Sequence, residues 1–405
     1  MSTIKGVVVV PAERSLFRGQ PAVVMAIAFA CVVSFMGIGL VDPILPSIAA
    51  QLNATSTESE LLFTTYLALT GVAMFFTSWV SSRIGTKKTL LFGLGLVVVF
   101  ALACGSAPAV APIIGFRAGW GVGNALFIST ALAAMVSAAS GGSASAIVLY
   151  ETALGIGLAL GPLTGGLLGS FSWRFPFFGS ATLMLVGLVA IAILLDMGHN
   201  AHDSTVRLSA PFKALRDPGM GTISIAAFFY NMAFFTTLAF PPFALARLHV
   251  SDAVSIGMVF FGWGALLAVS AVLVAPALVR IWRRTTIVLG AEIALAVLLV
   301  GCAVFASSAT GLIVCVILAG IPLGLLNTML TQCSMEASDL PRPVASSTYS
   351  GCRFLGGAIA PPLCTFLAGA TAVWVPFLYG AAMILVSGAI IAVRRQALAR
   401  ADEVV

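Results

Sequence analysis

Ionisable side chains inside otherwise apolar segments are the residues of this sequence that could do chemistry. Asp42, Arg117, Glu151 and Arg353 each lie within a long, nearly uncharged run. A carboxylate in such surroundings can bind and release a proton, and a nearby arginine favours its charged form. All three histidines fall between the apolar runs, so we expect a carboxylate to carry any transferred proton.

The composition excludes an ordinary water-soluble domain. Of the 405 residues, 60% are hydrophobic and only 8% are charged, with a mean hydropathy of +1.10. The uncharged stretches 22–41 and 219–246 each reach the roughly 20 residues that a helix needs to cross a bilayer. The seven cysteines show no CxxC pair and no histidine at ligand spacing, which predicts neither a disulfide framework nor a metal site. The first apolar segment leads into more of the same and is interpreted as retained, not as a cleaved leader.

Charged residues and Gly/Pro clusters divide the chain into twelve apolar segments, which predicts an all-α membrane protein. The expected helices cover 22–50, 61–82, 88–107, 110–137, 144–169, 174–195, 219–245, 253–280, 285–307, 310–335, 343–368 and 372–393.

The distribution of basic residues predicts the orientation of these helices. Of the 20 Lys and Arg residues, Arg174 and Arg247 fall on one side and Arg117 and Arg353 inside helices, which leaves 16 on the other side. By the positive-inside rule that side is cytoplasmic, and both termini lie on it. The net charge of +6 therefore reflects membrane topology, and no nucleic-acid partner is expected.

Residues recur at a fixed offset, which indicates a duplicated six-helix unit. Tyr150, Gly157 and Pro162 match Tyr349, Gly356 and Pro361, all 199 positions later, and Pro43 matches Pro242 in the same way. We therefore expect two pseudo-symmetric bundles, 1–196 and 219–405, joined by a polar linker at 197–218. The basic residues of the linker would be drawn to anionic headgroups.

Helix geometry places Asp42 and Arg117 at a similar depth in the outer half of the membrane, at about 1.5 Å per residue. Our hypothesis is that Asp42 alternates between a proton and the field of Arg117 or of a cationic substrate. In the alternative, Asp42 caps broken backbone at the outer rim, and Arg117 holds helix ends through carbonyl bonds.

Glu151 and Arg353 occupy matching helices of the two halves at a similar height above the cytoplasm. Either residue could belong to an inner gate or couple proton and substrate movement; in the alternative, they reach toward the membrane interface. Glu292 is expected on an outward-facing position of the ninth helix, although a charge facing lipid would be costly.

Three motifs resemble the drug:proton antiporter branch of the major facilitator superfamily. Residues 157–166 match G-x-x-x-G-P-x-x-G-G, a pattern associated there with exporters, through Gly157, Gly161, Pro162, Gly165 and Gly166. Independently of any family, such glycines let helices approach closely, and the proline bends the helix.

Two further motifs are similar but altered. Residues 117–123 resemble R-x-x-Q-G-x-G, with Trp120 in place of glutamine. Residues 78–87 resemble G-x-L-A-D-R-x-G-R-K and keep Arg83, Gly85 and Lys87. The residues that depart from the pattern include Ser78, Ser82 and Thr86. Ser82 replaces the aspartate that in the family helps to lock the cytoplasmic gate.

The resemblance implies proton-coupled efflux of drug-like or other amphipathic small molecules across the cytoplasmic (inner) membrane by alternating access. It implies a monomer with no cofactor, whose transport is driven by the proton gradient. The sequence contains no phosphate-binding loop of the G-x-x-x-x-G-K-[ST] type, so ATP is not expected as the energy source. A narrow-specificity exporter or symporter of a sugar or small metabolite remains the alternative. An enzyme would need clustered acids, histidines or a nucleophile at one depth, and these groups are dispersed.

An aromatic wall with sparse polar groups suits bulky, partly apolar substrates. The candidates for substrate binding are Tyr66, Asn124, Phe228, Tyr230, Asn231, Phe234, Phe235 and Asn327. Most phenylalanines of a membrane protein instead face lipid or helix packing, which is the alternative interpretation for this wall.

Overall fold

The computed structural model describes residues 19–41, 44–54, 56–195 and 206–403, and in these ranges the chain is built of helices without strands. Twelve of its helical segments are long and apolar enough to cross a membrane, which confirms the twelve predicted segments. They are α1 (Ala22–Gly39), α3 (Ser56–Ile84), α4 (Thr86–Ser106), α5 (Val110–Ala138), α6 (Gly142–Gly169), α7 (Phe175–Leu194), α9 (Pro218–Ala239) with α10 (Pro241–Ala246), α11 (Ala253–Val269) with α12 (Ala275–Val279), α13 (Arg284–Val304), α14 (Ala309–Glu336), α15 (Arg342–Ala370) and α16 (Val375–Val393).

Two predicted helices are interrupted near their C-terminal ends. The helix expected over 22–50 ends at Gly39, and a separate helix, α2 (Leu45–Leu52), follows. The helix expected over 219–245 breaks at Phe240, after which α10 begins with two prolines. Proline lacks the N–H that continues a helix, and its ring clashes with the preceding turn. The first crossing segment, Ala22–Gly39, is shorter than predicted, whereas Pro218–Ala246 remains one crossing segment as predicted.

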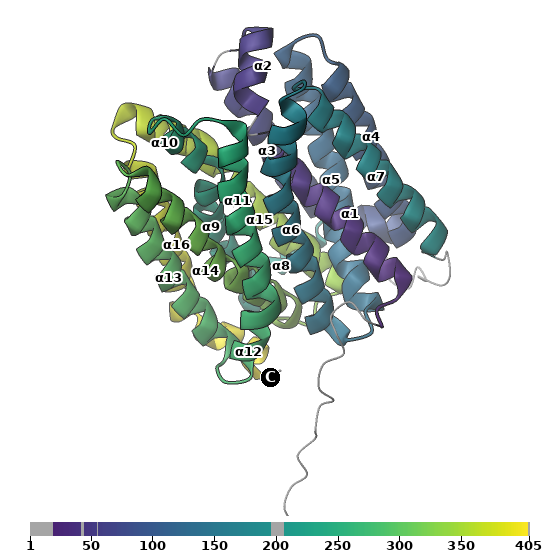
Figure 1. The fold of residues 1–405 in the computed structure, drawn as a ribbon. Coiled ribbons are helices and arrows are strands. Elements are labelled where there is room, and N and C mark those ends of the chain that lie inside the picture. Colours follow the sequence, from purple (N-terminus) through teal and green to yellow (C-terminus); the bar gives the residue numbers. More distant parts are fainter. Residues whose placement is uncertain (1–18, 42–43, 55, 196–205, 404–405) are drawn as a thin grey trace, which may run out of the picture.

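The first six long helices and the last six occupy opposite sides of the molecule (Figure 1). The most extensive contacts between the sides join α6 to α11 and α3 to α15. The first pair is close because Gly264 packs on Ala159: a Cβ at Gly264 would lie 2.5 Å from that of Ala159. In the second pair a Cβ at Gly71 would lie 2.8 Å from the amide nitrogen of Leu355. Small residues thus set the approach of the two sides.

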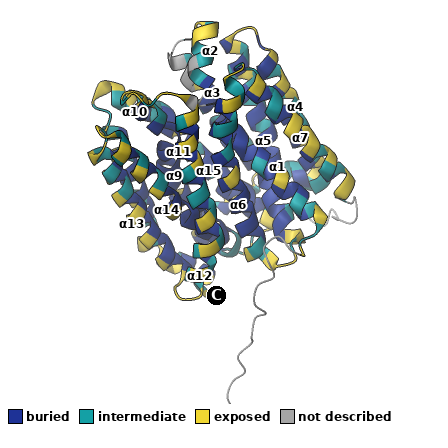
Figure 2. Ribbon diagram, in the orientation of Figure 1, coloured by how far each residue is buried: buried dark blue, intermediate teal, exposed yellow. Residues whose placement is uncertain are grey.

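Outward-facing positions of the helices are apolar and exposed, whereas inward-facing ones are buried (Figure 2). Val99, Ile193 and Val297 are 60%, 73% and 65% exposed. A continuous exposed apolar belt on helices of this length belongs in hydrocarbon, since water offers it no favourable contact. The chain is a multi-pass membrane protein.

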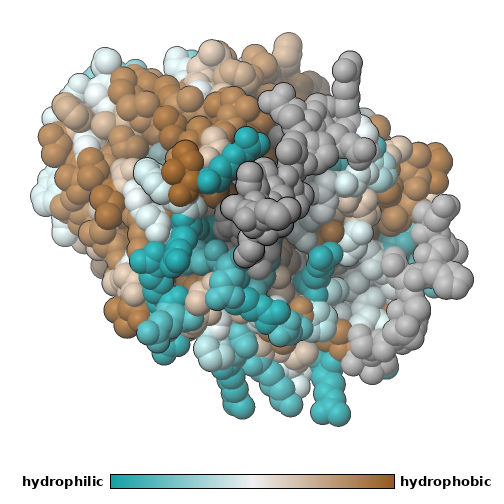
Figure 3. Space-filling model, turned by 90° about the horizontal axis from the view of Figure 1, so that it is seen from below, coloured by the Kyte–Doolittle hydropathy of each residue, from teal (hydrophilic) through white to brown (hydrophobic). Residues whose placement is uncertain are grey.

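One end of the bundle carries most of the basic residues, and we call it the basic end. Lys87, Arg284, Arg342 and Arg394 lie there, at or beside helix ends. Viewed from this end, hydrophilic side chains gather in a broad patch while hydrophobic ones lie mainly toward the rim (Figure 3). Three short helical segments also lie at this end: α8 (Ala210–Ala214), a 3-10 turn (Arg395–Leu398) and α17 (Ala399–Glu403).

Candidate functional site

A buried ion pair joins the two sides of the molecule near its centre. Glu151 of α6 and Arg353 of α15 are 0% and 5% exposed, and their Oε1 and Nη1 atoms are 3.7 Å apart. Thr331 of α14 donates a hydrogen bond of 2.7 Å to the same Oε1 atom. The second oxygen, Oε2, has no hydrogen-bond partner in the described part of the chain. Glu151 therefore has one fixed oxygen and one that can accept a proton.

Arg353 is held on its own side of the molecule by two asparagines. Its Nε donates to Oδ1 of Asn231 at 3.1 Å, and Nη2 donates to Oδ1 of Asn327. Tyr230 donates to the same Asn327 oxygen at 2.6 Å, and the Asn231 amide donates to the backbone oxygen of Arg353 at 2.7 Å. Because α9, α14 and α15 all contribute, the guanidinium has a fixed position whether or not Glu151 is charged.

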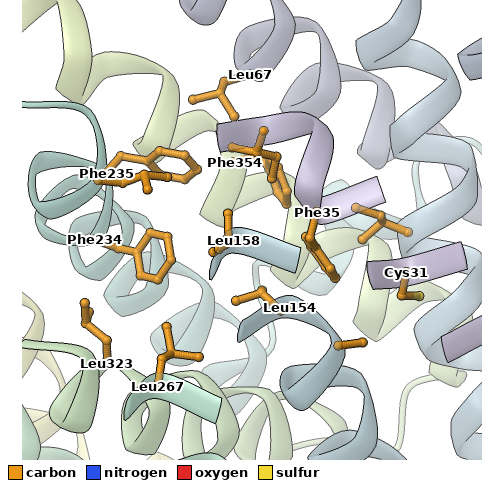
Figure 4. Close-up of a cluster of buried hydrophobic side chains, with 14 of the residues drawn as sticks. Cys31, Phe35, Leu67, Leu154, Leu158, Phe234, Phe235, Leu267, Leu323 and Phe354 are labelled. Atoms are coloured by element: carbon orange, nitrogen blue, oxygen red, sulfur yellow. The ribbon is translucent and has the colours of Figure 1, made fainter. Parts of the chain in front are cut away.

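An aromatic and aliphatic wall lies directly beside this ion pair. Phe234 and Phe235 of α9 face Phe35 of α1, Leu154 and Leu158 of α6 and Phe354 of α15 (Figure 4). With Tyr150, Asn231, Ser350 and Arg353 they enclose a gap of about 10 Å³, barely the space of one water molecule. The gap between these described residues is therefore too small for a bulky ligand, which could enter it only if the two sides separated.

The predicted substrate residues divide into three groups in the structure. Asn231, Phe234 and Phe235 line the central gap, while Tyr230 and Asn327 belong to the hydrogen-bond network of Arg353. Tyr66, Asn124 and Phe228 do not line this gap. Tyr66 packs under Arg117, Asn124 accepts a hydrogen bond from Ser34, and the half-buried Phe228 presents its backbone to Gly356.

Arg117 forms a second buried cationic centre, within the first half. Its guanidinium lies 4.2 Å from the ring centre of Tyr66 and 5.0 Å from that of Trp120. Its Nε and Nη1 donate to the backbone oxygens of Leu62 and Gly37, each at 3.2 Å. This geometry matches the alternative of an arginine that holds helix backbones. Asp42, its predicted partner, lies outside the described residues, and their proximity stays a prediction.

Two other acids have partners in the structure, and Glu292 lies elsewhere than expected. Glu292 faces neither lipid nor solvent: it is 1% exposed in α13 and accepts a 2.6 Å hydrogen bond from Ser387 of α16. Helix rotation places it in the α13–α16 contact, where Gly388 leaves room for its carboxyl group. Glu336, at the basic end, pairs with the buried Arg284.

Comparisons with known proteins agree with this architecture. The sequence profile of the Major Facilitator Superfamily matches residues 27–361. The chain belongs to this superfamily. It is a transporter, not an enzyme.

Three individual proteins are similar to this chain in sequence or in fold. The chain is 46% identical over 387 residues to the multidrug efflux protein YfmO of Bacillus subtilis, with 96% of each chain covered. It is 25% identical to the putative multidrug resistance protein MdtD of Yersinia pseudotuberculosis, over 59% of this chain and 50% of that one. The crystal structure of the human organic anion transporter MFSD10 superimposes with a TM-score of 0.75, covering 91% of this chain and 99% of that one at 14% identity. That likeness concerns the fold alone.

The superfamily's glycine motif lies on α6 and packs against α1. A Cβ at Gly157 would lie 2.5 Å from the backbone oxygen of Val32, and one at Gly161 would lie 2.6 Å from that of Met36. Gly165 approaches the backbone oxygen of Leu40 in the same way, and Pro162 packs on Gly39. Gly166 is buried in the same helix. The motif thus makes a backbone-to-backbone contact that no larger residue allows.

The superfamily loop between α3 and α4 keeps its turn and its cations. Gly85 has φ of +85°, a conformation that favours glycine, and directly precedes α4 as its N-cap. Lys87 donates to the backbone oxygen of Ala192 at 2.9 Å, and Arg83 lies 6.0 Å from the ring centre of Trp79. Ser82, at the position of the family's aspartate, donates to the backbone oxygen of Trp79 in its own helix.

Arg342 joins the two halves at the basic end, a role that the sequence analysis missed. At the start of α15, it donates to the backbone oxygen of Val136 at 3.1 Å and to Ser143 at 3.2 Å, both in the first half. One turn later Ser346 donates to the backbone oxygen of Ser129 at 2.9 Å. The acceptors are two backbone carbonyls of α5 and one hydroxyl of α6, and such groups give no signal in the sequence. They become recognisable only because the start of α15 lies beside the end of α5 and the start of α6.

Proposed function

We propose that this transporter exports drug-like, amphipathic small molecules across the cytoplasmic membrane in exchange for protons. The observation that carries the proposal is the buried Glu151–Arg353 pair, which links the two halves beside the aromatic wall. The 46% identity to a protein named for multidrug efflux supports the substrate class. The sparse polar groups of the wall suit bulky, partly apolar ligands.

Proton binding acts on the contact between the halves. Charged Glu151 attracts Arg353 in a poorly solvated site, and this attraction stabilises the closed centre. A proton on Oε2 removes the charge but keeps the Thr331 hydrogen bond, and Arg353 keeps its two asparagines. Protonation therefore weakens the ion pair between the halves and leaves the neutral Thr331 hydrogen bond across them, which favours their separation.

Opening exposes Glu151 to the substrate as well as to the proton, and a substrate that favours the charged carboxylate, above all a cation, displaces the proton. Opening of the centre frees Phe234 and Phe235 to contact an apolar ligand, while Asn231 and Arg353 offer it hydrogen-bond partners. Alternating access then exposes this site to one face of the membrane at a time. We place the basic end in the cytoplasm, because basic residues flank cytoplasmic helix ends.

The test is substrate-induced proton release from acid-loaded everted vesicles, followed with a pH-sensitive dye. Tetraphenylphosphonium, a neutral aromatic antibiotic and a sugar are added in turn to the parent protein, to Glu151→Gln and to Glu403→Gln. The control residue Glu403 is an exposed acid in α17. We expect the aromatic compounds to release protons from the parent and from Glu403→Gln, but not from Glu151→Gln.

Two results contradict the proposal in different ways. Full proton release from Glu151→Gln removes the coupling role of the Glu151–Arg353 pair. A response to sugars alone removes the drug-like substrate class and indicates a dedicated metabolite transporter.

A further inference from the structure

A second cavity lies away from the central gap, inside the first half at the basic end. Its volume is about 390 Å³, and it is partly open at that end. It is bounded by α1, α3, α4, α5 and α7, and Pro343 of α15 covers it from the opposite half. The cavity is therefore large enough for a small organic molecule, in contrast to the closed centre.

Hydroxyl groups dominate the polar lining of this cavity. The residues that provide them are Thr77, Ser78, Ser81, Thr86, Ser129, Thr130 and Ser137. Ser78 and Thr130 are only 1% and 4% exposed, and neither hydroxyl has a hydrogen-bond partner in the described part of the chain. Buried hydroxyls without partners are rare in proteins because each loses its bonds to water. These two are available to a ligand.

Two of the lining residues belong to the superfamily loop between α3 and α4 and depart from its pattern. Ser78 and Thr86 stand where the pattern has a glycine and an arginine, and both line the cavity. The glycine position thus gains a hydroxyl, and the arginine position loses its charge. As a result, no charged side chain is among the described residues that line the cavity.

The remaining lining is aliphatic. Val23 of α1, Ala133 and Ala134 of α5, and Leu194 and Leu195 of α7 supply it. A ligand that fits has an apolar part for these side chains and uncharged polar groups for the hydroxyls. A charged ligand would leave water without finding an opposite charge in the cavity, which disfavours it.

We propose that this cavity is a second binding site, for an uncharged amphipathic molecule that carries hydroxyl or carbonyl groups. This inference rests on the proposed export function and adds a substrate class and a place of entry to it. The site lies where the halves part, because Pro343 covers it and Ser346 hydrogen-bonds to Ser129 at its edge. A molecule bound there touches both halves before it reaches the central wall.

The test is equilibrium binding of radiolabelled phenyl β-D-glucoside to the full chain in nanodiscs, with tetraphenylphosphonium as the cationic comparison. Thr130→Val removes a hydroxyl at nearly constant volume, Ser78→Ala removes the other, and Ala134→Phe fills the cavity. Thr222→Val is the matched control, a buried threonine of α9 whose hydroxyl bonds to its own helix. We expect Thr130→Val and Ser78→Ala to weaken glucoside binding roughly five- to tenfold each, the worth of one hydrogen bond. Ala134→Phe abolishes it, while tetraphenylphosphonium binding and the control stay unchanged.

Several results overturn the inference. Glucoside binding that is absent from the parent, or unaffected by all three variants, shows a cavity that holds only water. Copurified phospholipid that native mass spectrometry detects on the parent but not on Ala134→Phe reassigns the cavity to a lipid headgroup. The proposed proton coupling is tested separately. Glu151→Gln should bind the glucoside like the parent, so a failure of the coupling proposal would change proton release and not glucoside binding.

Discussion

Replacement of Gly161 by alanine tests whether the glycine motif of α6 acts through contact with α1. The new Cβ would lie 2.6 Å from the backbone oxygen of Met36, whereas ordinary contact begins at 3.4 Å. The two helices must therefore separate by about 0.8 Å, since backbone cannot turn aside as a flexible side chain does.

The expected magnitude follows from two opposing effects. Overpacking of this kind costs about 1–3 kcal/mol, and alanine in place of glycine returns about 1 kcal/mol of helix propensity. Gly115 of α5 supplies the matched control, because a Cβ there would meet no atom within 4 Å. Gly115→Ala keeps the propensity gain alone, so the two variants should differ in unfolding free energy by about 1–3 kcal/mol.

Thermal unfolding with a thiol-reactive dye measures this difference in detergent. Six of the seven cysteines are buried and react only as the protein opens. We expect Gly161→Ala to have a lower midpoint than the parent and reduced drug efflux, because α1 carries Phe35 of the central gap. Equal midpoints for Gly161→Ala and Gly115→Ala would refute the packing argument.

Two further predictions concern the basic end. Arg342→Gln should favour opening at this end, since it weakens the charge-assisted bonds to Val136 and Ser143. If the lost bonds are worth about 1.4 kcal/mol, a cysteine introduced as Ser129→Cys should be labelled roughly tenfold faster in the Arg342→Gln background. Unchanged labelling would place the lock elsewhere. Hydrogen bonds from Arg400 hold the pKa of the exposed Asp339 below its ordinary range. A lowered native pKa stabilises the fold above the ordinary value of about 3.9 and ceases to do so as the pH falls through the native value. The midpoint of Asp339→Asn should therefore lie slightly below that of the parent at pH 7, and the two should converge in acid; a gap that widens in acid contradicts the sign.

The structure explains why the site was only partly predictable. Glu151 and Arg353 were each selected as buried charges in matching helices, but not as partners of one another. The roles of Thr331 and Arg342 carried no local signal, because threonine is common in helices and arginine is expected at a basic helix end. Their functions depend on which helix faces which, a property of packing between segments far apart in the chain.

The helix breaks show a second limit. Hydropathy predicted a helical segment over 22–50, since it averages over neighbouring residues and does not register where a backbone hydrogen bond is lost. The chain instead ends α1 at Gly39 and begins α2 at Leu45. Proline pairs such as Pro241 and Pro242 were a usable signal for the second break.

The sequence by itself determined that the chain spans a membrane twelve times and belongs to a transporter architecture. Hydropathy, charge and glycine spacing are local properties, and in lipid a backbone must satisfy its own hydrogen bonds, so each apolar segment has one outcome, a helix. Only the tertiary structure decided that Glu151 meets Arg353 across the halves, that the aromatic wall nearly fills its gap, and that Ser78 and Thr86 line one cavity. The rotation and pairing of helices set those contacts, and in a bilayer they depend on close packing between surfaces of similar polarity.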